Sequence, residues 1–164
     1  MWQRVQTLYL VLALICVFLA IFFPLFKLSI EDIEMVFDAY GAKGYEGGEM
    51  RTQKDVPLYL ANVLVGILIL VTLFLYKNRK KQLLVGRINF FLNIFLVIFL
   101  FTFTFWGVEI YASVENIELP EDVEYKTSLG LGFFFCVAVL PLVFLANLGI
   151  KRDEKLVRSL DRLR

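Results

Sequence analysis

The chain has 164 residues, of which 59% are hydrophobic, 16% are aromatic and 20% are charged. This apolar fraction exceeds what one soluble domain of this length needs for its core, so the composition argues against a soluble protein and for a chain in contact with lipid. The net charge of +1 hides a strong separation of charge along the chain, and the absence of histidine removes the commonest general base and metal ligand.

Four long stretches without a charged residue predict four transmembrane helices. They cover residues 5–26, 57–76, 88–108 and 129–150. At a rise of about 1.5 Å per residue, roughly 20 helical residues cross a hydrocarbon core of about 30 Å. Bulky residues follow the first stretch instead of a small-residue cleavage site, so we expect a retained anchor. The predicted fold class is an all-α membrane protein, a four-helix bundle.

The charges in the connections predict the orientation of this bundle. The connection 77–87 carries five basic residues and no acidic one, and the N-terminus and the tail 151–164 are also basic on balance. The connections 27–56 and 109–128 hold thirteen acidic residues against five basic ones. Because basic residues in short loops stay on the cytoplasmic side during insertion, we expect both termini in the cytoplasm and the acidic connections outside.

The outer connections carry a weak strand pattern. Residues 108–115 alternate between apolar and polar side chains, a period of two that is typical of a half-buried strand, and glycines at 41, 44, 47 and 48 indicate turns. A small external β-sheet and solvated loops are both compatible with this pattern.

The tail has an amphipathic pattern of its own. Leu156, Leu160 and Leu163 follow one another at helical spacing among charged residues. This pattern fits a basic helix lying on the inner membrane face, and it fits equally a continuation of the fourth span into water, with Gly149 as a potential break.

Small and polar residues within the spans mark the predicted bundle interior. Gln6, Asn89, Asn93 and Asn147 fall near the cytoplasmic ends of their spans, where they could meet in one polar cluster. The plain interpretation is interhelical hydrogen bonding, which contributes about 0.6–2 kcal/mol per bond in membranes. The functional interpretation is a pocket for a lipid headgroup or small ligand, in which Arg4 and Arg87 supply positive charge.

Other functional patterns are missing from the sequence. No span carries a charged residue at its centre, which argues against ion-coupled transport. Pro141 lies within the fourth span and predicts a kink that frees a backbone carbonyl near Val137. Cys16 and Cys136 both lie in apolar stretches, so we expect free thiols, and neither a catalytic constellation, a metal site nor a cofactor site is predicted.

The two ends of the chain resemble a known family. The start MWQRVQTLYLVLA and the tail KRDEKLVRSLDRLR are similar to the flanking segments of the domain-of-unknown-function 4293 family, small four-span inner-membrane proteins of Bacteroidota. The resemblance implies a bacterial inner membrane with the outer loops in the periplasm, and no activity. The matching residues are Gln3, Arg4 and Gln6 at the start and Asp153, Glu154, Arg158, Asp161 and Arg162 in the tail.

Two functional hypotheses follow. The first is a non-catalytic accessory or structural subunit whose tail, with Asp153, Glu154, Arg158, Asp161 and Arg162, docks a membrane-protein partner or a second copy at the cytoplasmic face. The second is a small carrier or a lipid-binding protein that uses the polar cluster. Neither involves nucleic acid or a cofactor, and a membrane enzyme is the least favoured class.

Overall fold

The computed structural model describes residues 2–30, 33–46, 49–53, 58–115 and 125–161, and among these the side chains of 5–29, 35–41, 43, 58–107 and 126–156. Its main elements are four long helices: α1 (Trp2–Phe22), α2 (Leu58–Phe74), α3 (Arg79–Glu115) and α4 (Leu131–Asp161). Each contains a segment long and apolar enough to cross a membrane. The predicted four-helix membrane fold is therefore confirmed.

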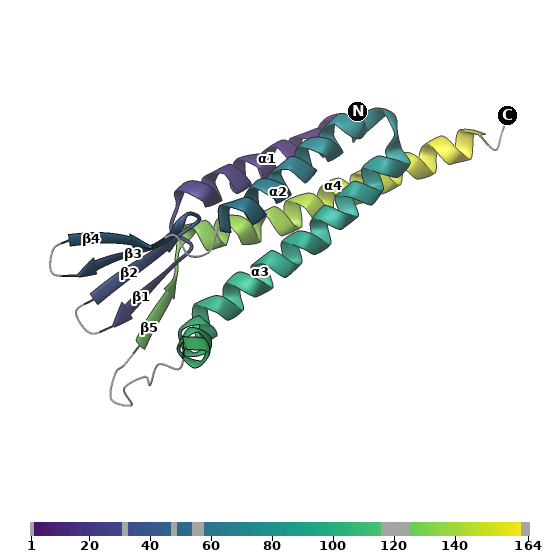
Figure 1. Ribbon diagram of the computed structural model, residues 1–164. Helices are drawn as coiled ribbons and strands as arrows, with labels where there is room; N and C mark the ends of the chain where they lie inside the picture. Colours follow the sequence, from purple (N-terminus) through teal and green to yellow (C-terminus); the bar gives the residue numbers. More distant parts are fainter. Residues whose placement is uncertain (1, 31–32, 47–48, 54–57, 116–124, 162–164) are drawn as a thin grey trace.

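The helices form a bundle in which α1 packs against α2 and α4, and α3 packs against the same two helices on the other side (Figure 1). The most extensive contact joins α1 and α4, the first and last helices of the chain. Ala13 and Ala20 on α1 and Ala146 on α4 are completely buried in the core. Small residues suit this position because lipid gives helices no hydrophobic reason to associate, so close backbone approach must supply the attraction.

The outward faces of the helices are apolar instead of charged. Phe91 and Phe95 are 66% and 68% exposed on α3, and Leu8 and Phe18 are similarly exposed on α1. A soluble bundle would present polar residues at such positions. This inverted pattern is what contact with lipid requires, since a polar side chain exposed to hydrocarbon would have no hydrogen-bond partner.

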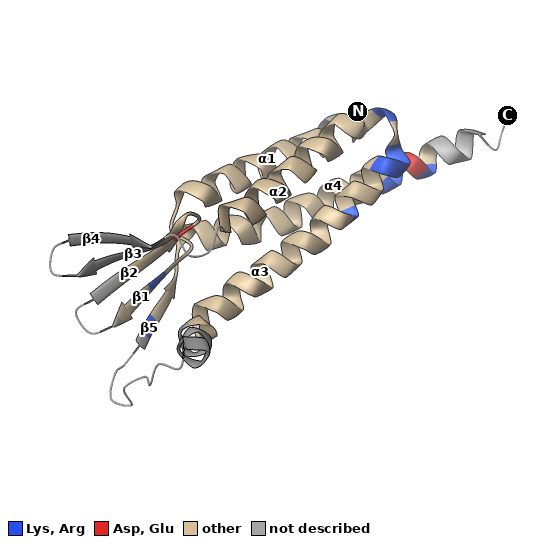
Figure 2. Ribbon diagram, in the orientation of Figure 1, with Lys and Arg blue, Asp and Glu red and all other residues tan. Residues whose placement is uncertain are grey.

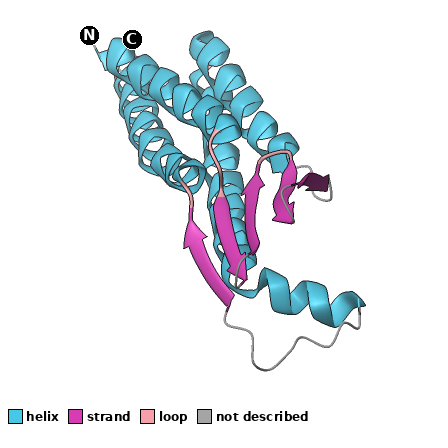
Figure 3. Cartoon of the chain, turned by 90° about the vertical axis from the view of Figure 1, so that its left-hand side faces the viewer, coloured by secondary structure: helices cyan, strands magenta, loops and turns pink. Residues whose placement is uncertain are grey.

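Five short strands form an antiparallel sheet at one end of the bundle (Figure 3). They are β1 (Phe26–Ile30), β2 (Ile33–Asp38), β3 (Gly41–Glu46), β4 (Glu49–Gln53) and β5 (Tyr125–Leu129), in the order β4-β3-β2-β1-β5. We call this end of the molecule the sheet end. The external β-element is confirmed, with a position in the sequence that differs from the predicted one.

Backbone hydrogen bonds connect the sheet to the helices. Gly130 N donates to Leu25 O at 2.9 Å, and Gly132 N donates to Pro24 O at 2.8 Å. A β-carbon at Gly130 would collide with the Pro24 carbonyl, so only glycine fits at this crossing. The stacked rings of Phe26 and Phe37, with centroids 4.4 Å apart, continue the bundle core into the sheet.

The strand predicted from the alternation over residues 108–115 is wrong. These residues continue α3, which ends at Glu115, and the strands come from residues 26–53 and 125–129. A helix propagates cheaply once it is nucleated, and neither proline nor glycine follows Gly107 before Glu115 to stop it. The strands that do form follow Pro24, which ends the first span four residues earlier than predicted.

The prediction of an 11-residue connection at 77–87 is also wrong. Only a 3₁₀ turn, η1 (Leu75–Lys77), and Asn78 separate α2 from α3. Asn78 caps α3, because its Oδ1 accepts a hydrogen bond from Lys81 N at 3.3 Å. The basic residues mark the end of the apolar segment, and they remain helical because Lys and Arg have good helix propensity.

The tail continues α4 without interruption as far as Asp161, with Gly149 inside the helix. Of the two alternatives left open by the sequence, the structure therefore has the continued helix. Figure 2 shows that the Lys and Arg residues of this extension lie beside those at the start of α3. We call this the basic end of the bundle, with the exposed residues Lys77, Lys80, Lys81, Arg87, Lys151, Arg152 and Lys155.

Candidate functional site at the basic end

A buried carboxylate joins three helices at the basic end. Asp153 Oδ2 on α4 accepts a hydrogen bond from Gln6 Nε2 on α1 at 2.8 Å and lies 3.1 Å from Arg79 Nη1 on α3. Asp153 is only 7% exposed, although it lies in the charged extension of α4. Burial of a carboxylate is tolerated only when it is paired and hydrogen-bonded, and both conditions are met here. We call these three residues the Asp153 clamp.

Gln82 supplies a second polar contact close to the clamp. Its Nε2 donates to Thr72 O at 3.0 Å, and the Thr72 hydroxyl donates to Leu68 O at 2.7 Å. Thr72 lies in the last turn of α2, where backbone carbonyls begin to lose their partners within the helix. Gln82 therefore replaces one of those partners and ties α3 to the end of α2.

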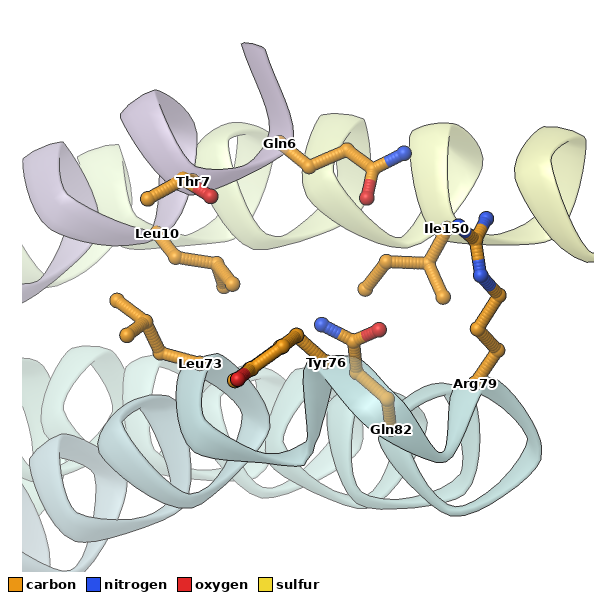
Figure 4. A pocket seen from close by; sticks show the side chains of 8 residues that line it. All are labelled: Gln6, Thr7, Leu10, Leu73, Tyr76, Arg79, Gln82 and Ile150. Atoms are coloured by element: carbon orange, nitrogen blue, oxygen red, sulfur yellow. The ribbon is translucent and has the colours of Figure 1, made fainter. Parts of the chain in front are cut away.

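A cavity of about 140 Å³ lies between these contacts (Figure 4). All four helices and η1 contribute to its wall, which combines polar groups with apolar side chains. It is lined by Gln6, Thr7, Leu10, Leu73, Tyr76, Arg79, Gln82 and Ile150. Two members of the Asp153 clamp thus form part of its surface.

Asn147 packs on Gly86, about one turn of α4 before Ile150, which lines the cavity. Asn147 Nδ2 donates to Gly86 O at 2.9 Å, and a β-carbon at Gly86 would collide with Asn147 Oδ1. Asn89 is 1% exposed on the next turn of α3, and among the described residues neither of its amide atoms has a hydrogen-bond partner. Asn147 Oδ1 is likewise without one.

A third polar contact lies deeper in the bundle, next to Pro141. Asn93 Nδ2 lies 3.5 Å from Cys136 O, and Cys136 Sγ lies 3.5 Å from Asn62 Oδ1. Cys136 precedes Val137, whose carbonyl the proline deprives of its usual donor. An amide from α3 thus reaches the carbonyl next to the one that Pro141 deprives of its helical donor. Cys16 and Cys136 are both free thiols.

The polar residues proposed as one cluster therefore lie at three levels along α4. Gln6 bonds at residue 153, Asn147 itself marks the second level, and Asn93 bonds at residue 136. At about 1.5 Å per residue, the first and third levels are about 25 Å apart. Arg87 is exposed, and the side chain of Arg4 lies outside the described ones. The amides line the core of the bundle instead of surrounding one ligand.

The tail residues proposed for docking also have different environments. Asp153 is buried in the clamp and Glu154 is half-buried, so neither is a free surface charge. The backbone at Arg158 and Asp161 belongs to α4, but their side chains lie outside the described ones, and Arg162 lies outside the described residues. The exposed charges of the described extension are basic ones.

Sequence reasoning missed Arg79, Gln82, Thr72 and Tyr76. Gln82 falls within the basic segment taken for a loop, which concealed it. A periodic signal was nevertheless present, because Gln82, Gly86, Asn89 and Asn93 follow one another at spacings of four, three and four residues, which is one face of a helix. Among the described residues, no group of three His, Cys, Asp or Glu side chains is placed to hold a metal ion.

The family described as "Domain of unknown function (DUF4293)" matches residues 2–163, nearly the whole chain. The curated proteins include no match to the sequence.

Proposed function

Because the chain belongs to the DUF4293 family and folds as a multi-pass membrane protein, we propose that it is a non-catalytic accessory subunit of a larger membrane complex. Its basic end binds the partner, which is another membrane protein with an acidic surface. The cell compartment that fits this proposal is the cytoplasmic membrane of a bacterium, with both termini inside. No nucleic acid and no cofactor takes part.

The observation that carries this proposal is the Asp153 clamp. A charged tail that is merely solvated needs no buried carboxylate, whereas a helix that must present charges in a fixed place does. The clamp anchors the α4 extension to α1 and α3, so the basic segment of this extension is held beside the basic start of α3 (Figure 2). A rigid surface loses little conformational entropy on binding, which favours its use as a docking site.

Purification from gently solubilised membranes tests the proposal. The tagged wild-type chain should recover one partner at constant stoichiometry, and the double variant Lys80→Glu and Lys81→Glu should lose it. The matched control is Lys27→Glu with Lys126→Glu, which reverses two exposed charges at the sheet end. Recovery of the chain alone, or only of further copies of itself, would contradict an accessory role beside another protein.

The orientation has a separate test. Lys81→Cys and Lys126→Cys place single reporters at the basic end and the sheet end, in exposed positions. A membrane-impermeant maleimide should label intact cells at position 126 and leave position 81 unlabelled until the cells are opened. The wild-type chain measures the background from the two native cysteines. Labelling of position 81 in intact cells would reverse the orientation.

A second candidate function is lipid or small-ligand binding at the basic end, as a carrier or a binding protein. The cavity of about 140 Å³ favours it, because ligand sites in bundles combine apolar walls with a few convergent polar groups. A lipid-shaped density in this cavity in an experimental structure would support it. A cavity that stays empty of lipid when the protein is purified in lipid nanodiscs would argue against it.

A further inference from the structure

The cavity at the basic end has hydrogen-bonding groups that the protein itself leaves unused. Gln6 and Gln82 each direct their amide nitrogen to a protein acceptor, Asp153 and the Thr72 carbonyl respectively. These bonds fix the orientation of both amides, so their oxygens remain as acceptors. Within the described part of the chain, no group donates to either oxygen. Both residues are 7% exposed, and neither oxygen is among the fully buried polar atoms without a partner, so water or a ligand in the cavity can reach each of them.

Arg79 supplies hydrogen-bond donors at another part of the cavity surface. Among the described side chains, Asp153 is the partner of Arg79 Nη1 at 3.1 Å, whereas a guanidinium carries five N–H donors in a planar fork. The remaining donors suit a phosphate oxygen. Figure 4 shows the Arg79 side chain at one side of the space and the Gln6 and Gln82 amides between the helices. The free donors of Arg79 and the amide oxygens of Gln6 and Gln82 therefore lie on different parts of the cavity surface.

The balance of charge restricts the ligand further. Arg79 carries the one formal charge among the described lining residues, and Asp153, which is not itself part of the lining, balances that charge from 3.1 Å away. A simple anion would meet the two amide oxygens as well as the guanidinium, and a simple cation would meet the guanidinium as well as the oxygens. A group that carries an ammonium next to a phosphate satisfies both sets of atoms at once.

The position of the cavity indicates where such a group comes from. Tyr76 lines it and is 59% exposed, which is typical of a tyrosine at the boundary between lipid and water. Leu10 and Leu73 form an apolar part of the wall on the side of the membrane-spanning segments. A headgroup entering here keeps its acyl chains among the apolar helix faces.

We propose that the cavity binds the headgroup of a phospholipid with a primary ammonium, the phosphoethanolamine group of phosphatidylethanolamine. The ammonium donates to the oxygens of Gln6 and Gln82, and the phosphodiester accepts from Arg79. This inference rests on the second candidate function, lipid binding at the basic end, and gives it a chemical identity. It does not depend on the accessory role.

Competition among lipids tests the proposal on the full chain. The delipidated protein in detergent is titrated with short-chain phosphatidylethanolamine, phosphatidylcholine and phosphatidylglycerol, and bound lipid is counted by native mass spectrometry. Phosphatidylcholine has a trimethylated nitrogen that cannot donate hydrogen bonds, so we expect it to bind about tenfold more weakly. Phosphatidylglycerol lacks the ammonium and should also bind about tenfold more weakly.

Three variants locate the site. Gln82→Met is close to glutamine in volume and removes the amide oxygen, so it should abolish the preference for phosphatidylethanolamine over phosphatidylcholine. Arg79→Lys keeps a partner for Asp153 and loses the planar fork, so it should weaken all phospholipids alike. Lys80→Gln removes the neighbouring exposed charge outside the cavity and should change neither result.

The outcomes separate the possible failures. Equal binding of all three lipids, with no effect of Gln82→Met, overturns the headgroup assignment while lipid binding itself survives. Soluble glycerophosphoethanolamine that binds as tightly as the lipid shows that the ligand is a free metabolite, which overturns the lipid source. Absence of any bound lipid or glycerophosphoethanolamine overturns both this inference and the second candidate function.

Discussion

Asp153→Asn is the substitution that most directly tests the Asp153 clamp. Asparagine keeps the shape of the side chain and an oxygen that can still accept from Gln6 Nε2. It removes the negative charge that faces Arg79 Nη1 at 3.1 Å. The variant therefore separates the ion pair from the amide hydrogen bond.

The burial of the pair sets the size of the expected effect. The side chain of Asp153 is 9% exposed and that of Arg79 is 25% exposed. Removal of one partner from a fully buried pair costs about 3–5 kcal/mol, but a partly exposed arginine can turn toward water, so we expect about 2 kcal/mol for Asp153→Asn. Asp153→Leu also loses the bond from Gln6 and should cost about 3–4 kcal/mol.

Reversible unfolding in mixed micelles measures these free energies. The control variant Lys151→Gln changes an exposed charge two residues away and should stay within about 0.5 kcal/mol of wild type. Limited trypsin digestion gives a second measurement, because a released α4 extension should be cut faster at Lys155 in Asp153→Asn. In a double-mutant cycle, Arg79→Gln should cost less in the Asp153→Asn background than in the wild type.

An Asp153→Asn variant with wild-type stability and wild-type digestion would refute this reasoning. Free energies for Arg79→Gln and Asp153→Asn that add to within about 0.5 kcal/mol would refute it as well, since they would show that the two groups are not coupled. The extension would then be held by packing alone, and the docking proposal would lose its structural support.

Three further predictions concern the contacts between helices, and the same unfolding measurement checks all of them. Gly86→Ala should cost about 1–3 kcal/mol because its methyl group collides with Asn147, and the loss should shrink in an Asn147→Ala background; an equal loss in both backgrounds would contradict the contact. Asn93→Leu should cost about 0.6–2 kcal/mol because it removes the contact with the Cys136 carbonyl. Asn89→Leu should be neutral or stabilising because Asn89 has no partner among the described groups. A larger loss of stability for Asn89→Leu than for Asn93→Leu would contradict both assignments. Gly130→Ala should cost about 2–3 kcal/mol, since the obstacle is the Pro24 backbone, and a tolerated alanine would show that the junction with the sheet is loosely packed.

The spans, their number and the clustering of basic residues at one end follow from the sequence because they depend on local quantities. A stretch without charge is long enough to cross a bilayer or it is not, and each of the four stretches coincides with a helix, most closely the first and second with α1 and α2. The interior positions of Asn89 and Asn93 were also predictable, since a polar side chain in an apolar helix must face its neighbours.

The boundaries of helices beyond the membrane were not predictable in the same way. Hydropathy marks the end of the apolar segment, and a helix such as α3 extends past it on both sides because charged residues are good helix formers. The sheet was equally hidden, because β5 comes from a segment about 95 residues after β1 and pairs with it only once α1 and α4 lie together.

The polar groups at the basic end show most clearly which features follow from the sequence and which depend on the tertiary structure. Sequence alone predicted that Gln6 and the basic segments that contain Arg79 and Asp153 lie at the same end of the bundle, because each is close to the end of an apolar stretch. Only the tertiary structure decided that Asp153 turns inward to Gln6 and Arg79 while Lys151 stays outside. The physical reason is that a buried charge is permitted by its partners, and those partners come from helices about 70 and 150 residues away in the chain.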